Sequence, residues 1–225
     1  MPRASLFAVS LFFLCPLVLA DTIIAFEGFP DGTVLAAQYS GLIFSNAVIL
    51  SAGITLNEFE FAPHSGIAVA SDNGGAMTIT FASPVQAFSG YFTYSVPVTL
   101  QAFDSSNNQV ATAVSRFSSN EAFSGVLGSR PNELLRATAS RIARVVITGL
   151  SGGTSFTVDD ISASAFSPCD VNQDAVVDVV DVQGVINEAL GVTPSINDLN
   201  QDGTVNTVDI QLVMNAALGL GCGAS

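Results

Sequence analysis

The last quarter of the chain contains one acidic unit twice. Residues 170–191 read DVNQDAVVDVVDVQGVINEALG, and residues 198–219 read DLNQDGTVNTVDIQLVMNAALG, an offset of 28 residues. A fixed period of this kind indicates a duplicated structural unit that folds in the same way in both copies. The residues that recur unchanged include Asp170, Asn172, Asp174, Asp181, Gln183, Asn187, Ala189, Leu190 and Gly191.

The first twelve residues of each copy place oxygen atoms at the spacing of a calcium-binding loop. Such a loop offers Ca²⁺ about six to eight oxygens from its places 1, 3, 5, 7, 9 and 12, and a glycine at place 6 makes the sharp turn. An acidic solvated turn is the alternative, but it does not require this spacing twice. The predicted ligands are Asp170, Asn172, Asp174, the carbonyl of Val176, Asp178 and Asp181 in the first loop, and Asp198, Asn200, Asp202, the carbonyl of Thr204, Asn206 and Asp209 in the second.

The units differ from an EF-hand pair in two ways. Place 12 is aspartate in both loops, and only six residues separate Gly191 from Asp198, which leaves no room for a helix before the second loop. Each unit is therefore predicted to be a loop followed by one helix. This arrangement resembles a type I dockerin, over about residues 169–222 of a predicted domain at 168–225.

The resemblance implies two calcium ions and a partner, a cohesin-type domain on another protein. It also implies that places 10 and 11 of each loop bind that partner. These places are more apolar here than the Ser and Thr often found in the family, so a purely intramolecular or surface role is the alternative. The implied partner-binding residues are Val179, Val180, Thr207 and Val208.

One position departs from the family pattern. Ala175 stands where the first loop should have glycine, and alanine in a left-handed turn costs on the order of 1 kcal/mol. Asp178 gives the same loop a fourth carboxylate where the second loop has Asn206, and added negative charge favours a dication. The two effects oppose each other, so the relative affinities of the two loops stay open.

Two cysteines flank the duplicated units. Cys169 precedes the first loop and Cys222 follows the second predicted helix. The ends of a pseudo-symmetric pair of loop–helix units should lie close together, and export favours oxidation. A disulfide between Cys169 and Cys222 is therefore expected, and two free thiols are the alternative.

The N-terminus indicates export. Arg3 precedes an apolar run from Leu6 to Leu19, and Val18 and Ala20 stand before a predicted cleavage point, so residues 1–20 read as a secretory signal peptide. A membrane anchor needs about 20 apolar residues, and Pro16 interrupts a shorter run. The predicted location of the mature protein is extracellular, with no membrane anchor. The net charge of −13 also argues against binding to nucleic acid.

Residues 21–167 read as a separate β-sandwich module, which makes the predicted fold mostly β with a small all-α tail. Turn signals such as DNGG (72–75), DSSNNQ (104–109) and SGG (151–153) separate the apolar segments. About ten strands of this kind favour a two-sheet, jelly-roll-like sandwich. Residues 132–144 contain good helix formers and are expected to be a short turn or helix before a strand. The predicted strands include 22–26, 76–81, 87–94, 96–103, 143–150 and 155–165.

The function of the sandwich is less constrained. The dockerin resemblance implies cargo that works on polysaccharide, so a carbohydrate-binding module or a small glycoside hydrolase is the alternative to a non-catalytic recognition or structural module. Tyr39, Tyr91 and Tyr94 are the only non-phenylalanine aromatics, and His64 is the only histidine. Glu27 with Asp159 or Asp160 is a further candidate calcium site. The acids considered for hydrolysis are Glu27, Glu58, Glu60, Glu121, Glu133, Asp159 and Asp160, among which the sequence places no pair.

Overall fold

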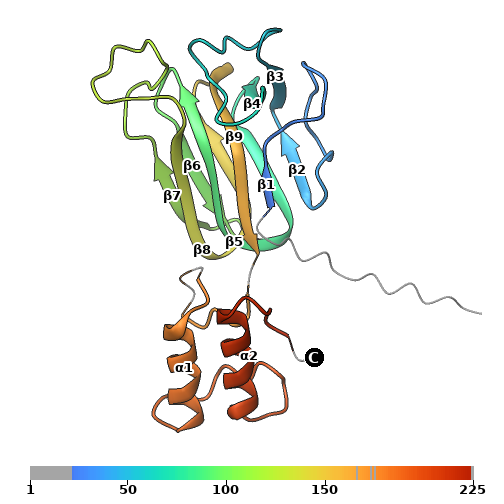
Figure 1. Ribbon diagram of the computed structural model, residues 1–225, viewed down its shortest axis with the longest axis vertical. Helices are drawn as coiled ribbons and strands as arrows, with labels where there is room; N and C mark the ends of the chain where they lie inside the picture. The colour runs from blue at the N-terminus through green and yellow to red at the C-terminus, as the bar shows by residue number, and fades with distance from the viewer. Residues whose placement is uncertain (1–21, 166, 173, 175, 224–225) are drawn as a thin grey trace, which may run out of the picture.

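The computed structural model describes residues 22–165, 167–172, 174 and 176–223. Within these residues, nine strands form one antiparallel sheet, and two helices follow it in a separate C-terminal part (Figure 1). The strands are β1 (Thr22–Ile24), β2 (Leu42–Ser45), β3 (Ala47–Ser51), β4 (Ala68–Asn73), β5 (Met77–Tyr94), β6 (Thr99–Phe103), β7 (Gln109–Val114), β8 (Glu133–Thr148) and β9 (Gly153–Ala165). The helices are α1 (Val179–Ala189) and α2 (Thr207–Ala217).

The sheet becomes a sandwich because its two longest central strands bend together. The first part of β5, from Met77 to Thr80, pairs with the end of β8 and with β2, whereas β5 beyond Val85 pairs with the beginning of β8 and with β9. Irregular register at the bend lets both strands pass from one layer to the other, with Val85 opposite Ile142. The strand order is β3-β4-β9-β5-β8-β6-β7, and β1 and β2 pair with β9 and β5. The mostly β, two-layer prediction is confirmed.

One core fills the space between the two layers. Side chains alternate between buried and less buried positions along β3 and β6, as a strand with one face against a core requires. Phenylalanine supplies much of the core, although Phe59 and Phe123 lie exposed on loops. The largest fully buried side chains include Tyr94, Phe26, Phe88, Phe92 and Phe156.

The expectation of a turn or helix at 132–144 is wrong, because strand β8 begins at Glu133 and continues to Thr148. Leu135 and Ala137 are buried while Leu134 and Arg136 are exposed, which is the two-residue alternation of a strand. Pairing with β5 over residues 133–138 fixes this conformation. Tertiary pairing therefore overrides the helix propensity of these residues.

The helical tail (residues 167–223) has its own small core. Helices α1 and α2 pack on each other around Cys169, Val185, Leu212 and Val213, with partly buried Val177 and Val205 from the two loops against them. A core of this size stabilises a domain only modestly. No helix in the described ranges is long and apolar enough to cross a membrane.

Candidate functional site

The side chains at loop places 1 and 3 point at one position in both acidic loops. In the second loop the amide nitrogen of Asp202 donates to Asp198 Oδ1 and to Asn200 Oδ1, both at 3.1 Å. In the first loop the amide of Asp174 donates in the same way to Asp170 Oδ1 at 3.1 Å and to Asn172 Oδ1 at 3.0 Å. The duplicated sequence therefore produces duplicated geometry.

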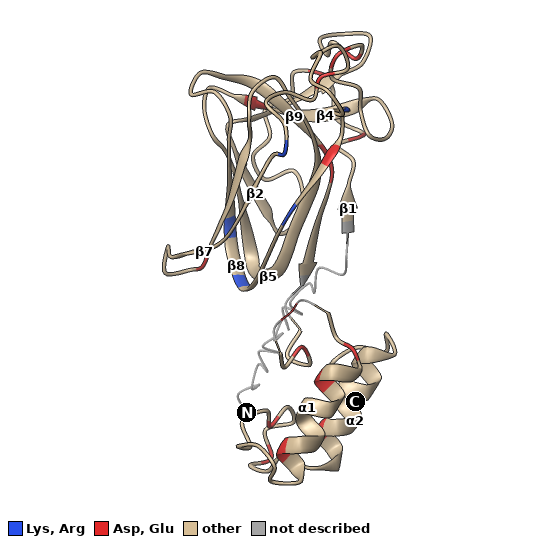
Figure 2. Ribbon diagram, turned by 90° about the vertical axis from the view of Figure 1, so that its left-hand side faces the viewer, with Lys and Arg blue, Asp and Glu red and all other residues tan. Residues whose placement is uncertain are grey.

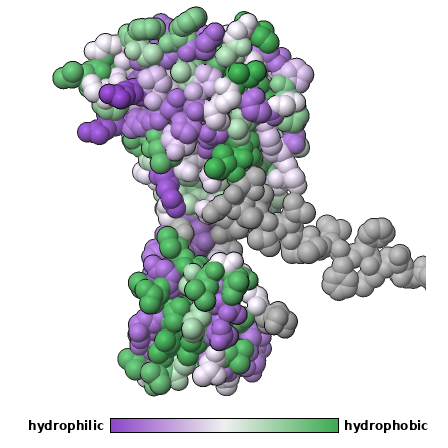
Figure 3. Space-filling model, viewed as in Figure 1, coloured by the Kyte–Doolittle hydropathy of each residue, from purple (hydrophilic) through white to green (hydrophobic). Residues whose placement is uncertain are grey.

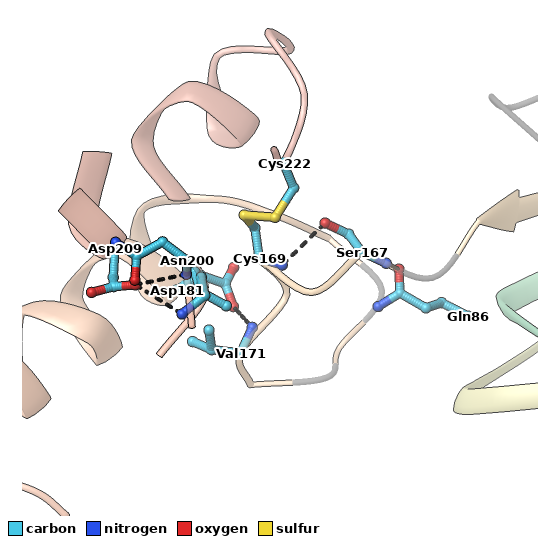
Figure 4. Close-up of a disulfide and its surroundings, with 9 residues drawn as sticks. Gln86, Ser167, Cys169, Val171, Asp181, Asn200, Asp209 and Cys222 are labelled. Atoms are coloured by element: carbon cyan, nitrogen blue, oxygen red, sulfur yellow. Dashed lines mark hydrogen bonds between the residues drawn. A yellow bond between two sulfur atoms is a disulfide. The ribbon is translucent and has the colours of Figure 1, made fainter. Parts of the chain in front are cut away.

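The aspartate at place 12 is the buried centre of each loop. Asp209 is fully buried; its Oδ1 accepts from the amide of Leu199 at 2.8 Å, and its Oδ2 accepts from the amide of Asn206 at 2.9 Å. Asp181 makes the matching contacts with Val171 and Asp178, both at 2.9 Å (Figure 4). Each carboxylate thus joins the beginning of its loop to the beginning of its helix.

The same loop residues start the helices. Asp178 and Asn206, at place 9, are the N-caps of α1 and α2 and accept from the amides of Val180 and Val208. Together with the aspartates at place 12 they complete a capping box at each helix. Any change in the loop is therefore transmitted directly to the helix that follows it.

The backbone of the second loop has the turn that place 6 requires. Gln201 at place 4 and Gly203 at place 6 have φ angles of 59° and 91°, in the left-handed region that glycine adopts without strain. The corresponding residues of the first loop, Gln173 and Ala175, lie outside the described residues. The expectation about strain at Ala175 therefore stays a prediction.

The charged side chains of the tail are all acidic. Its sequence has eight acidic residues and no lysine or arginine, and Figure 2 shows acidic segments around both loops. Hydrogen bonds from Asn200 and Thr204 lower the pKa of Asp202, which keeps this carboxylate ionised and available to a cation. Repulsion among these carboxylates favours any bound cation.

The residues present fit Ca²⁺. Each loop offers carboxylate, amide and carbonyl oxygens only, the donor set that a hard cation prefers. No three His, Cys, Asp or Glu side chains in the described part of the chain form a ready-made metal cluster. Backbone amides donate to both carboxylate oxygens of Asp198 in the second loop.

The residues implied to bind a partner lie on the surface. Val179 and Val180 at the start of α1 are 74% and 55% exposed, and Val208 at the start of α2 is 48% exposed. An open groove of about 860 Å³ runs along α1, and Figure 3 shows apolar surface over the tail. The groove is lined by Val171, Asn172, Val179, Val180, Gln183, Gly184, Asn187, Glu188, Thr193, Pro194, Ile196 and Asn197.

The expected disulfide is confirmed. Cys169 and Cys222 are joined, with their Cα atoms 5.8 Å apart, and the bond ties the beginning of the tail to its end (Figure 4). Cys169 is also part of the small tail core. The bond therefore closes both loop–helix units into one module.

The three acids proposed for a further calcium site hold one short segment instead of converging. Asp159 Oδ2 accepts from the amides of His64 and Ser65, both at 2.9 Å, and Glu27 Oε1 accepts from the amides of Ile67 and Ala68. Asp160 accepts from the Ser65 hydroxyl and contacts His64 Nδ1 at 2.6 Å. A third ion at these residues stays a prediction.

The tyrosines do not line a common groove. Tyr94 is buried and donates to Glu133, Tyr39 packs among Phe26, Phe29 and Phe44, and Tyr91 stacks on the ring of His64 at 3.5 Å between centroids. Burial and the Glu133 hydrogen bond raise the pKa of Tyr94 to about 12, so its phenol stays protonated. These rings therefore do not form one aromatic platform for a sugar.

The remaining candidate acids are occupied by nearby donors. Glu58 accepts from the Gly53 amide, and Glu121 accepts from the Ser119 hydroxyl. Glu60 accepts from the Asn57 side chain at 2.8 Å. A pocket of about 160 Å³ in the sandwich has no acidic lining residue; it is formed by Leu50, Leu56, Asn57, Phe61, Ser71, Thr154, Phe156 and Thr157.

Sequence reasoning missed two polar residues that matter to the tail. Glu188 is buried in α1 and accepts from the amides of Ile196 and Asn197, both at 2.9 Å, which fixes the segment between the units. Gln86 on β5 contacts the tail from the sandwich. Glu188 could have been noticed as the acid that becomes Ala216 in the second copy, whereas no sequence signal marks Gln86.

Comparison with known proteins places the tail in a family. The family model described as "Dockerin type I domain" matches residues 168–218. No curated protein matches the chain in sequence.

Several solved structures resemble the sandwich distantly. A family 6 carbohydrate-binding module is 15% identical over 59% of this chain and 92% of that one, with a TM-score of 0.34. A family 29 carbohydrate-binding module is 10% identical over 65% and 92%, with a TM-score of 0.36. An arabinose-bound α-L-arabinofuranosidase is 14% identical over 65% of this chain and 26% of that one, with a TM-score of 0.38. Similarity at this level carries no argument about ligand or activity, and the identification rests on the tail: residues 168–218 are a type I dockerin domain, which follows a β-sandwich.

Proposed function

We propose that this chain is an exported calcium-binding protein whose dockerin tail docks the β-sandwich onto a cohesin-bearing partner. The observation that carries the proposal is the repeated loop geometry, in which place 9 caps the helix and place 12 joins loop to helix in both units. The partner belongs to polysaccharide-degrading or cell-surface assemblies, and the sandwich is the non-catalytic cargo.

Calcium neutralises the loop carboxylates and favours the arrangement that orders the helices. Asp181 and Asp209 have the central role, because each is buried and joined to its own helix N-terminus. The remaining ligands in the proposal are Asp170, Asn172, Asp174, the carbonyl of Val176 and Asp178 in the first loop, and Asp198, Asn200, Asp202, the carbonyl of Thr204 and Asn206 in the second.

The docking face consists of the exposed residues at the two helix starts, Val179, Val180, Thr207 and Val208. Apolar side chains that reach the surface at both capped helix ends are suited to a partner surface with apolar pockets. Because the helix starts also contain the N-caps, loss of calcium should disorder this face. That coupling makes the proposed docking calcium-dependent.

Export fits the same account. The Cys169–Cys222 disulfide is a bond that persists in an oxidising compartment, and the predicted signal peptide at residues 1–20 lies outside the described residues. The proposed location is extracellular.

The test compares wild type with Asp209→Ala. Removal of this carboxylate leaves the amides of Leu199, Asn200 and Asn206 without their acceptor, so the capping box of α2 should lose the half that Asp209 supplies. Calorimetry should count two calcium ions in wild type and one in the variant, and binding to a panel of cohesins should fall below detection. A third ion in wild type would support the prediction at Glu27. The control Glu121→Ala, on a sandwich loop, should leave ion count and binding unchanged.

The alternative assigns activity or sugar binding to the sandwich. The frequent association of dockerins with proteins that act on polysaccharide supports this alternative. The separation of the three tyrosines and the hydrogen bonds already made by the candidate acids argue against it. Reducing-sugar release from a broad set of polysaccharides checks the catalytic form. Hydrolysis that disappears on changing Glu27, Glu58, Glu60, Glu121, Glu133, Asp159 or Asp160 to alanine, without loss of fold, would overturn the non-catalytic assignment.

A further inference from the structure

The sandwich reaches the first calcium loop through one buried side chain. Gln86 Nε2 donates to Asp170 Oδ2. Gln86 Oε1 accepts from the amide of Ser167 at 3.2 Å, a contact that Figure 4 shows. Gln86 is only 3% exposed, and it lies beside Ser167 at the beginning of the tail (Figure 4). One amide group therefore spans the junction between the two parts of the chain.

A β-bulge directs this side chain toward the tail. On β9, Ala165 and Ser164 are consecutive residues, but their partners on β5 are Val85 and Ala87, so Gln86 is the extra residue. A bulge of this kind releases one residue from the ladder and re-aims its side chain. The register of β5 with β8 also shifts between Val85 and Ala87. The position of Gln86 is therefore set by the bend of the sandwich itself.

The contact is made by the first loop and has no counterpart from the sandwich among the described contacts of Asp198 in the second loop. Asp170 and Asp198 both stand at place 1, and in each case Oδ1 accepts from the amide at place 5 at 3.1 Å. Asp170 has an additional donor from outside the tail and is 3% exposed, whereas Asp198 is only partly buried. The first loop is thus built with help from the sandwich.

The chemistry of the contact suits a ligand-positioning role. A carboxylate has about four lone-pair sites on its two oxygens, so a hydrogen bond to Oδ2 orients Asp170 without using its capacity to bind a cation. A neutral amide donates a hydrogen bond without repelling a dication, whereas the positive charge of Lys or Arg would repel it. Partners that orient metal ligands in this way commonly change metal affinity about 10- to 100-fold when removed.

We propose that Gln86 is a positioning residue for calcium in the first loop, so that the sandwich raises the calcium affinity of this loop. The inference rests on the proposed calcium binding of the tail. In this proposal the sandwich contributes to calcium binding by the first loop, whereas the second loop binds calcium independently of the sandwich.

The test is a calcium titration of the full chain in the presence of a competing chelator. Amide NMR signals of Val176 and Thr204, at place 7 of the two loops, report the loops separately. Gln86→Met keeps the side-chain volume and removes both hydrogen bonds, so the apparent affinity at Val176 should fall about tenfold or more while that at Thr204 stays unchanged. The control Gln101→Met removes a side-chain amide on β6 that donates to Gln109, and it should change neither curve.

An unchanged Val176 curve in Gln86→Met, or equal weakening of both loops, would overturn the inference and leave the proposed function standing. Absence of any calcium response in either loop of wild type would overturn both. If Gln86→Met disturbs the amide signals of the sandwich, Gln86→Asn replaces it. This shorter amide cannot span Ser167 and Asp170, so it should give the same selective loss at Val176.

Discussion

Asp159 is a buried carboxylate held by backbone amides. Burial raises its pKa to about 6 from 3.8, against the opposing effect of the amides of Ser65, Asp160 and His64. Because the folded state binds the proton more tightly than the unfolded chain, this group contributes stability below about pH 4, and the contribution is lost as pH rises through 6. Its size is at most about 3 kcal/mol, since one pKa unit corresponds to about 1.4 kcal/mol.

Urea unfolding at pH 4 and pH 7.5 measures this effect. The change in the unfolding free energy of wild type between the two pH values contains the Asp159 contribution, and Asp159→Asn should remove it. Asp160→Asn is the matched control and should retain most of it, because burial is the largest cause of the raised Asp159 pKa and the charge of Asp160 a smaller one. An identical pH dependence in wild type and Asp159→Asn would show that the Asp159 pKa is not raised.

Glu188 is a residue at which the two loop–helix units differ. It accepts from two backbone amides of the segment that leads to the second loop, and Ala216 stands at the equivalent position of α2. Glu188→Ala should therefore destabilise the tail by about 1–3 kcal/mol, because the amides of Ile196 and Asn197 lose their acceptor. Glu188→Gln keeps an acceptor oxygen and should cost less. Thermal unfolding followed by the helical circular dichroism signal compares the two variants.

At the scale of elements, the disulfide closes a segment of 53 residues around both helices. A cross-link over this length stabilises the tail by about 4 kcal/mol in the chain-entropy treatment. Cys169→Ser with Cys222→Ser should therefore lower the melting temperature of α1 and α2 and leave the unfolding of the sandwich unchanged. A tail that melts at the same temperature in the double variant would contradict this estimate.

The elements also show what the sequence could and could not predict. The repeated loop geometry follows from local spacing, and the disulfide follows from the pseudo-symmetry of the units, so both were predictable. Strand β8 was not, because Leu135 and Arg136 have helix propensity and only pairing with β5 decides their conformation. The Gln86 contact depends on a bulge and on where the tail lies, and neither leaves a mark in the sequence.

At the scale of the whole molecule, calcium should act on the tail and leave the sandwich as it is. Eight acidic residues without a basic partner repel one another when no cation is bound, whereas the sandwich has one large apolar core. Added calcium should raise the helical signal and its melting temperature, and magnesium should do much less because its octahedral shell is stricter. Circular dichroism with each ion in turn, after chelator treatment, checks this.

The central claim is that the folded chain docks on its partner through a calcium-ordered tail. The most direct measurement is binding of the full chain to a cohesin panel, first with calcium, then with excess chelator, and then with calcium restored. Binding should be lost with chelator and return with calcium, while the near-ultraviolet signal of the sandwich stays constant. Binding that persists in chelator, or no binding to any cohesin with calcium present, would contradict it.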